Sequence, residues 1–157
     1  MLTAGKERSP LIEINVSSEI YAVTFTANGE YIVSGGRDGI GLWRVADGKQ
    51  MATMEARNVY CLAVSQDGRW IAAGTHDGDV FVWDTETSEQ VFTHKDVHLI
   101  IAVDFSPNPT RLLVGQNYHH TGPSICDVPT PKSLNTRKRY DGSEVLAARR
   151  SNRESHL

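Results

Sequence analysis

Apolar and polar residues alternate with a period of two along most of this chain, in short runs separated by turn residues. The run "VFVW" at 80–83 follows an Asp-Gly pair, and the run "AVTF" at 22–25 precedes an Asn-Gly pair. β-branched and aromatic residues gather in these runs, which is typical of half-buried strands. No long stretch has apolar residues at helical spacing. We therefore expect an all-β chain built from short hairpins.

Turn signals of the Asn-Gly, Asp-Gly and Pro-Asn-Pro types punctuate the chain at intervals of roughly ten residues. The predicted strands between them lie at 11–16, 20–26, 30–35, 40–44, 50–54, 59–64, 70–74, 79–84, 89–93, 99–105, 111–115 and 123–128.

The pattern also repeats on a longer scale. "VSGGRDGIGLW" from Val33 has an echo in "AAGTHDGDVFVW" from Ala72, so that Asp38 falls on Asp77. A third copy begins at "IIAVDFSPNPTRLLVG" and then fades, and "EVLAARRSN" at 144–152 carries a trace of a fourth. The copies stand 39 to 41 residues apart. A period of this length predicts stacked units, each a small sheet.

The segments "GEYIVSGGRDGIGLWRV", "SQDGRWIAAGTHDGDVFVWD" and "FSPNPTRLLVG", with the Trp-Asp pair at Trp83 and Asp84, resemble WD-repeat β-propellers. The resemblance covers residues 11 to 128, and it implies an open, partial propeller of four-stranded antiparallel blades. The expected organisation has a flexible N-terminus at 1–10, a partial propeller at 11–128 and a basic tail at 129–157 that holds the trace of a further repeat. The expected blades lie at about 20–54, 59–93 and 99–128.

Propellers close with about four to eight blades, and this chain offers fewer. Three interpretations stay open: a piece of a larger WD-repeat protein, an arc that completes a ring with copies of itself or with another arc, and a marginally folded product. We favour the first, which includes a truncated gene product without independent function. In the second, the chain self-associates through its exposed blade faces.

The predicted hairpin at 30–44 is one residue shorter in its turn than its counterpart at 70–84 in the second repeat. Ile40 and Leu42 align with Val80 and Val82 when counted back from the tryptophans, so the alternation is intact up to the turn. A deletion inside the strand would have moved every side chain to the other face. We therefore place the gap beside Gly39, within a glycine-rich turn that accepts positive φ.

The resemblance also implies a buried network of polar side chains that stiffens a blade. Carried over position by position, its members here are Ser34, Asp38 and Trp43 in the first repeat, and Asp77 and Trp83 in the second. Each copy lacks a member of the family's network, because Val16 and Glu55 stand where a histidine is expected and Ala73 replaces the hydroxyl. A partial network stabilises little, so we expect apolar packing to hold the blades together. Trp70 is expected to pack between neighbouring blades.

The distribution of charge along the chain limits the classes of partner that we expect. The net charge is −3, but residues 1 to 128 carry −7 and residues 129 to 157 carry +4. An acidic body is unsuited to polyphosphate partners, so we expect no nucleic acid. There is no apolar run of about 20 residues for a membrane span and no secretory leader pattern. Cys61 and Cys126 are too few for a disulfide framework, and we expect buried free thiols in a cytoplasmic protein, with the nucleus as the alternative.

Candidate catalytic or metal-binding residues are weak. His94 and His98 have metal-ligand spacing only on a helix, and we place them in a surface loop, as we do His119 and His120. Asp77 and Asp79 lack the other ligands of a calcium loop and are expected in a turn. We find no phosphate loop and no nucleophile elbow. We therefore expect no enzyme, no metal and no cofactor.

Protein binding is the stronger prediction. The resemblance implies that the partners are other proteins or protein complexes, bound at the top face of the propeller. The matching positions are Glu19, Tyr21, Arg37, Asn58, Tyr60 and His76. Tyrosine and arginine are enriched at binding hot spots. The alternative is that the two tyrosines are partly buried strand residues and the others ordinary turn residues.

Overall fold

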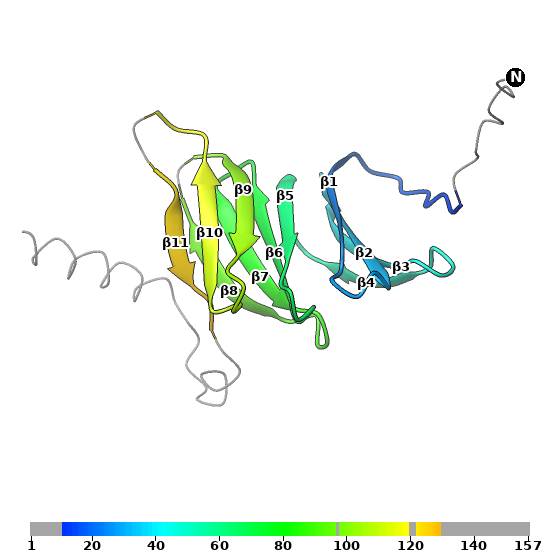
Figure 1. The fold of residues 1–157 in the computed structure, drawn as a ribbon. Coiled ribbons are helices and arrows are strands. Elements are labelled where there is room, and N and C mark those ends of the chain that lie inside the picture. The colour runs from blue at the N-terminus through cyan, green and yellow to red at the C-terminus, as the bar shows by residue number, and fades with distance from the viewer. Residues whose placement is uncertain (1–10, 97, 120–121, 130–157) are drawn as a thin grey trace, which may run out of the picture.

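The computed structural model describes residues 11–96, 98–119 and 122–129, whose regular structure is entirely β (Figure 1). Three antiparallel sheets follow one another along the chain, and we call them blades 1, 2 and 3. Blade 1 contains β1 (Ile20–Phe25), β2 (Tyr31–Gly36), β3 (Gly39–Arg44) and β4 (Gln50–Met54). Blade 2 contains β5 (Val59–Val64), β6 (Trp70–Thr75), β7 (Asp79–Asp84) and β8 (Gln90–Lys95). Blade 3 contains β9 (Ile100–Phe105), β10 (Arg111–Gln116) and β11 (Ser124–Asp127).

The blades stack face to face into an open arc with blade 2 in the middle, and their first strands, β1, β5 and β9, lie side by side (Figure 1). Two apolar cores fill the two interfaces. The core between blades 1 and 2 contains Val33, Ile40, Leu42, Met54, Val59, Ile71, Ala73 and Trp83. The core between blades 2 and 3 contains Ala63, Trp70, Ala72, Val80, Val82, Phe92, Ile100, Val103, Leu112, Val114, Cys126 and Val128. Blade 2 therefore packs against a neighbouring blade on each of its two faces, and β6, all six of whose residues are buried, lies at its centre.

The predicted strands from residue 20 onward are all present, with bounds within two residues of those expected, and β4, β5 and β7 have the predicted bounds. The period-two pattern and the turn residues determine these elements locally. Trp70, which is 2% exposed, packs in the core between blades 2 and 3, as predicted. Among the described residues there is no helix of the length and hydropathy needed to cross a bilayer.

The strand predicted at 11–16 is wrong, because this segment has no regular structure and pairs with no sheet. The last strand of each blade directly precedes the first strand of the next blade, as β4 precedes β5 and β8 precedes β9. A strand before β1 would therefore belong to a sheet preceding blade 1. The described part of the chain contains no such sheet, and a strand without a ladder partner leaves its backbone groups to water. The predicted flexible N-terminus at 1–10 lies outside the described residues. So do the tail, apart from Pro129, and its trace of a fourth repeat.

The β2–β3 hairpin of blade 1 differs from the longer β6–β7 hairpin of blade 2 only in its turn. In blade 1, Gly36 pairs with Gly39, which leaves a two-residue loop of Arg37 and Asp38. Gly39 has φ of 138°, in the region that glycine adopts and other residues avoid. The alternation beyond the turn is unchanged, because Ile40 and Leu42 both face blade 2. The prediction that the deletion lies in the turn is confirmed.

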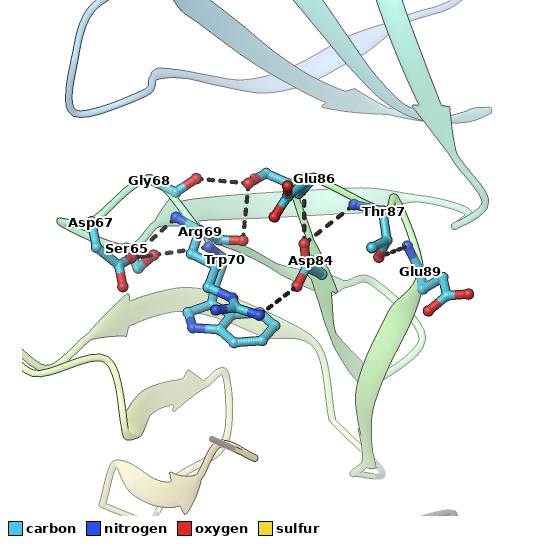
Figure 2. Close-up of polar contacts among 10 residues, drawn as sticks. Ser65, Asp67, Gly68, Arg69, Trp70, Asp84, Glu86, Thr87 and Glu89 are labelled. Carbon is cyan, nitrogen blue, oxygen red and sulfur yellow. Dashed lines mark hydrogen bonds and ion pairs between the residues drawn. The ribbon is translucent and has the colours of Figure 1, made fainter. Parts of the chain in front are cut away.

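At the lower edge of the blades, hydrogen bonds within the chain satisfy the polar turns (Figure 2). The Ser65 hydroxyl donates to the Asp67 carboxylate at 2.6 Å and accepts from the Trp70 amide at 2.9 Å. Thr26 and Ser106 accept from the amides of Tyr31 and Arg111 in the same way, at 3.1 and 3.2 Å. In each blade, this repeated turn connects the first strand to the second.

Asp84 organises the turn between β7 and β8. Its carboxylate is 4% exposed and accepts hydrogen bonds from the amides of Glu86 at 2.9 Å and Thr87 at 3.3 Å (Figure 2). The Arg69 guanidinium reaches the other carboxylate oxygen at 3.4 Å and lies over the Trp70 ring, 4.9 Å from its centroid. These contacts account for the carboxylate's burial.

Candidate protein-binding surface

The edge at which β1, β5 and β9 begin is the top face, uppermost in Figure 1. Tyr21 lies in a β-bulge, because the pairing with β2 shifts register between Ile20 and Ala22. Tyr60 occupies the same place in β5. A bulge redirects its side chain away from the sheet, and these two tyrosines are 46% and 47% exposed.

The two tyrosines form an aromatic pair across neighbouring blades. Their ring centroids are 6.2 Å apart, with the planes tilted by 36°. The Tyr21 hydroxyl donates a hydrogen bond of 2.7 Å to Glu19, which raises the pKa of Tyr21 because the bond is lost when the phenol ionises. Tyr21 is thus held in one orientation while much of its ring faces solvent.

Backbone hydrogen bonds connect the remaining predicted residues. The Arg37 amide donates to the Glu19 carbonyl at 3.0 Å, and the His76 amide donates to the Asn58 carbonyl at 2.9 Å. The Asn58 amide donates to the Arg37 carbonyl at 3.1 Å and so joins blade 1 to blade 2. Asn58 has φ of 52°, a left-handed conformation that asparagine tolerates better than most residues. The structure therefore brings all six predicted residues to one edge.

Asp77 belongs to this surface rather than to a buried network. Its side chain is 61% exposed and lies 3.6 Å from the ring nitrogen Nδ1 of His76. The Asn58 amide group donates to it at 3.5 Å. The resemblance assigned Asp77 to a buried network in blade 2, whereas the structure exposes its carboxylate in the turn between β6 and β7.

Blade 3 continues the surface with residues that the sequence analysis did not select. Ile101 occupies the bulge position of Tyr21 and Tyr60 and is 47% exposed. Beside it, the His98 ring stacks against Tyr118 with centroids 4.0 Å apart, and Nδ1 of His98 lies 3.3 Å from Asp96. The repeat phase could have identified this extension, because Ile101 stands 41 residues after Tyr60.

Of the expected blade network, one polar contact forms. Nε1 of Trp43 donates to the Ser34 hydroxyl at 2.7 Å, and both residues are at most 9% exposed. Asp38 is exposed in the two-residue turn, and within the described ranges no hydrogen bond joins it to Ser34 or Trp43. The short turn leaves this carboxylate outside the blade.

In blade 2, apolar packing replaces the network. Trp83 is 2% exposed and packs against Phe81, with ring centroids 5.5 Å apart, in the core facing blade 1. Asp77 lies on the top face, away from this core. The position that a hydroxyl would take is Ala73, which is part of the same apolar core.

The remaining candidate residues have structural surroundings. Cys126 is buried. Partial burial raises the pKa of the Cys61 thiol to about 11, which suppresses its reactivity. His94 lies in β8 rather than in the predicted loop, because β8 extends to Lys95. Across residues 11–96, 98–119 and 122–129, no group of three or more His, Cys, Asp or Glu side chains is placed to hold a metal ion.

Comparison with known proteins agrees with this geometry. The family model described as "WD domain, G-beta repeat" matches residues 9–40 and 48–84. The crystal structure of the Cps50 (Swd1) β-propeller domain of Myceliophteria thermophila aligns with a TM-score of 0.68 over 76% of this chain and 37% of that one, at 18% identity. The chain carries WD40 repeats at these residues, and its fold is an open, partial β-propeller. This fold is generally a non-catalytic scaffold.

Curated relatives share parts of the propeller. The WD repeat and SOCS box-containing protein 1 of Mus musculus is 36% identical over 106 residues, which are 63% of this chain and 25% of that protein. The ribosome biogenesis protein BOP1 of Rattus norvegicus is 38% identical over 56 residues, 36% of this chain and 8% of that protein. The partial propeller therefore spans a quarter or less of the length of these relatives.

Proposed function

We propose that this partial propeller is a non-catalytic scaffold that binds other proteins through its top face. The observation that carries the proposal is the pair of half-exposed tyrosines on neighbouring blades, 6.2 Å apart. Tyrosine supplies a large contact area at a low cost in conformational entropy. Tyr21 and Tyr60 are each fixed on a bulge, so little further ordering opposes binding.

The surroundings of the pair suit a protein partner. Exposed Arg37 and His76 border the tyrosines, and Ile101 extends the apolar surface into blade 3. An apolar centre with a polar and charged rim is the usual arrangement of a protein interface. The charged rim groups, Glu19 and Arg37 among them, would contribute specificity more than affinity.

The names of two relatives support a role in protein assembly. One is named for ribosome biogenesis and another for a SOCS box joined to WD repeats. These names describe those proteins, and they favour protein complexes as the class of partner for this chain.

The test compares the wild-type chain with the double variant Tyr21→Ala/Tyr60→Ala. Each chain is immobilised, exposed to an extract of its source cells, and its bound proteins are quantified by mass spectrometry. We expect specific partners of the wild type to fall about tenfold with the double variant, as for a hot-spot pair. Thermal melts should show that the double variant is folded, because both side chains are half exposed.

Phe25→Ala is the matched control. Phe25 is also an exposed aromatic residue of β1, 62% accessible, but it lies at the opposite end of the strand. The control should retain the wild-type partners. Equal binding by the double variant and the wild type would disprove the top face as the site.

A further inference from the structure

The two interfaces inside the arc share one packing feature. Val59, the first residue of β5, is fully buried over Gly35 of blade 1, where an added Cβ would lie 2.5 Å from its Cγ1 atom. Ile100, the first residue of β9, is fully buried over Gly74 of blade 2, where an added Cβ would lie 2.3 Å from its Cγ2 atom. In both interfaces, therefore, a β-branched knob fills a notch left by a glycine in the second strand of the preceding blade.

One knob and one notch remain unfilled at the two ends of the arc. Ile20 has the position of Val59 and Ile100, since it also begins the first strand of its blade, yet it is 39% exposed. Gly115 has the position of Gly35 and Gly74, since it pairs with the residue after the bulge. Of the described residues, those nearest to an added Cβ at Gly115 belong to its own blade, with Ala102 Cβ nearest at 3.3 Å.

The Ile20 knob faces the open side of blade 1. It borders a groove of about 380 Å³ together with Ser34, Gly41 and Trp43. Trp43 corresponds to Trp83 of blade 2, whose face is covered by blade 1. The groove thus lies on the face that blade 2 uses to pack against its neighbour.

Exposed apolar side chains surround both free halves. On blade 3, Leu113 and Ile125 are 44% and 67% exposed, whereas their equivalents in blade 2, Ala72 and Val82, are fully buried. The open face of blade 1 carries exposed apolar residues of its own, Val23 and Phe25, at 68% and 62% exposure. Exposed apolar patches of this kind mark interaction sites.

We propose that a second copy of this chain docks head to tail on the arc, with Ile20 of one copy seated over Gly115 of the other. The occupant is a second copy because the same chain carries both unfilled halves of a contact that it already makes twice internally. The two surfaces differ, so the interface is heterologous. Two three-bladed arcs would together supply a number of blades within the range of about four to eight at which propellers close. This association uses the blade faces and leaves the top face free.

The test uses one variant for each half of the contact. Gly115→Val fills the notch, and Ile20→Asp places a charge on the knob. Light scattering coupled to size-exclusion chromatography should show the wild-type full chain as a dimer or larger oligomer whose fraction rises with concentration. Each variant alone should be monomeric, with an apparent dissociation constant raised at least about tenfold. Gly122→Val is the matched control, since no described heavy atom lies within 4 Å of its Cβ position, and it should associate like the wild type.

Mixing the two variants distinguishes a blocked contact from a damaged fold. The free notch of Ile20→Asp can still receive the intact knob of Gly115→Val, so the mixture should form one-to-one heterodimers that neither variant forms alone. A monomeric wild type over the whole concentration range would overturn the proposal. So would variants that keep the wild-type mass, or a mixture that stays monomeric. The double variant Tyr21→Ala/Tyr60→Ala separates this proposal from the proposed function. It lacks the tyrosines of the top face but should keep the wild-type oligomeric state.

Discussion

Gly35 of blade 1 and Gly74 of blade 2 occupy equivalent positions, and each allows the next blade to approach closely. A Cβ at Gly74 would lie 2.3 Å from Ile100 and 2.7 Å from the Cys61 sulfur, both within a packed region of the arc. Real carbon atoms do not approach so closely, and a core packed like a crystal has little room to yield. The absence of a side chain at this position is therefore part of the interface.

Gly74→Ala should destabilise the protein by about 1–3 kcal/mol, the usual cost of overpacking. Gly115→Ala is the matched control, because the described atoms nearest its Cβ belong to Ala102, at 3.3 Å. Both substitutions are made in the Ile20→Asp background, where no second copy seats a side chain over Gly115. We expect the effect of Gly115→Ala to stay within about 0.5 kcal/mol. Urea unfolding of the Ile20→Asp protein and of both variants in that background measures the difference, and equal midpoints for the two variants would contradict the knob-and-notch packing.

At the scale of single residues, the candidate site was largely predictable. The resemblance to WD-repeat propellers selected Tyr21, Tyr60, Arg37 and their partners, and the structure places them along one edge, although their role in binding stays a prediction. The outward orientation of Asp77 was not predictable. It depends on the path of the turn between β6 and β7, which the repeat alignment alone does not reveal.

At the scale of the element, buried polar turns fix where each hairpin ends. Asp84 is 4% exposed and holds two backbone amides of the turn after β7. Its ion pair with Arg69, a side chain 41% exposed, contributes little, because solvent screens partly exposed pairs. The amides are therefore the contacts that matter for the turn.

Asp84→Ala should lower the free energy of unfolding by about 1.5–3 kcal/mol, since it removes hydrogen bonds to a charged acceptor. Asp84→Asn keeps one acceptor oxygen and should lose less. Asp47→Ala is the control in the equivalent turn of blade 1, where the carboxylate is exposed and pairs with Arg44. Chemical denaturation should rank the losses with Asp84→Ala the largest, and a larger loss at Asp47 would contradict this account of the turn.

The positions of the strands show how much of the secondary structure the local sequence pattern predicts. From residue 20 onward, the alternation and the turn residues predicted each strand to within two residues. The segment at 11–16 has a similar pattern but forms no strand. A strand needs a neighbour for its backbone groups, and the presence of that neighbour is not encoded in the segment itself.

At the scale of the whole molecule, the arc has one blade covered on both faces and two blades covered on one. All six residues of β6 are buried, whereas β1 has an exposed or half-buried side chain at every position. Local opening costs least where few apolar contacts are broken. Stability should therefore decline from the centre of the arc toward its ends.

Native-state hydrogen exchange measures this gradient. Amides of β6 and β7 should exchange only through global unfolding, while those of β1 and β11 should exchange through smaller openings that denaturant accelerates less. The comparison is best made with the monomeric Ile20→Asp variant, because association would protect the end blades. Equal protection in β6 and β11 of that variant would show that the arc opens as a single unit.

The sequence by itself determined the β class, the strands from residue 20 onward and the repeat. These depend on short-range alternation and turn chemistry, which each repeat carries within itself. Only the tertiary structure decided which apolar faces stay exposed and which polar groups turn outward. Leu113 and Ile125 have the same pattern in the sequence as the buried Ala72 and Val82. A residue's burial depends on the sheet that packs against it, and that neighbour lies outside its own repeat.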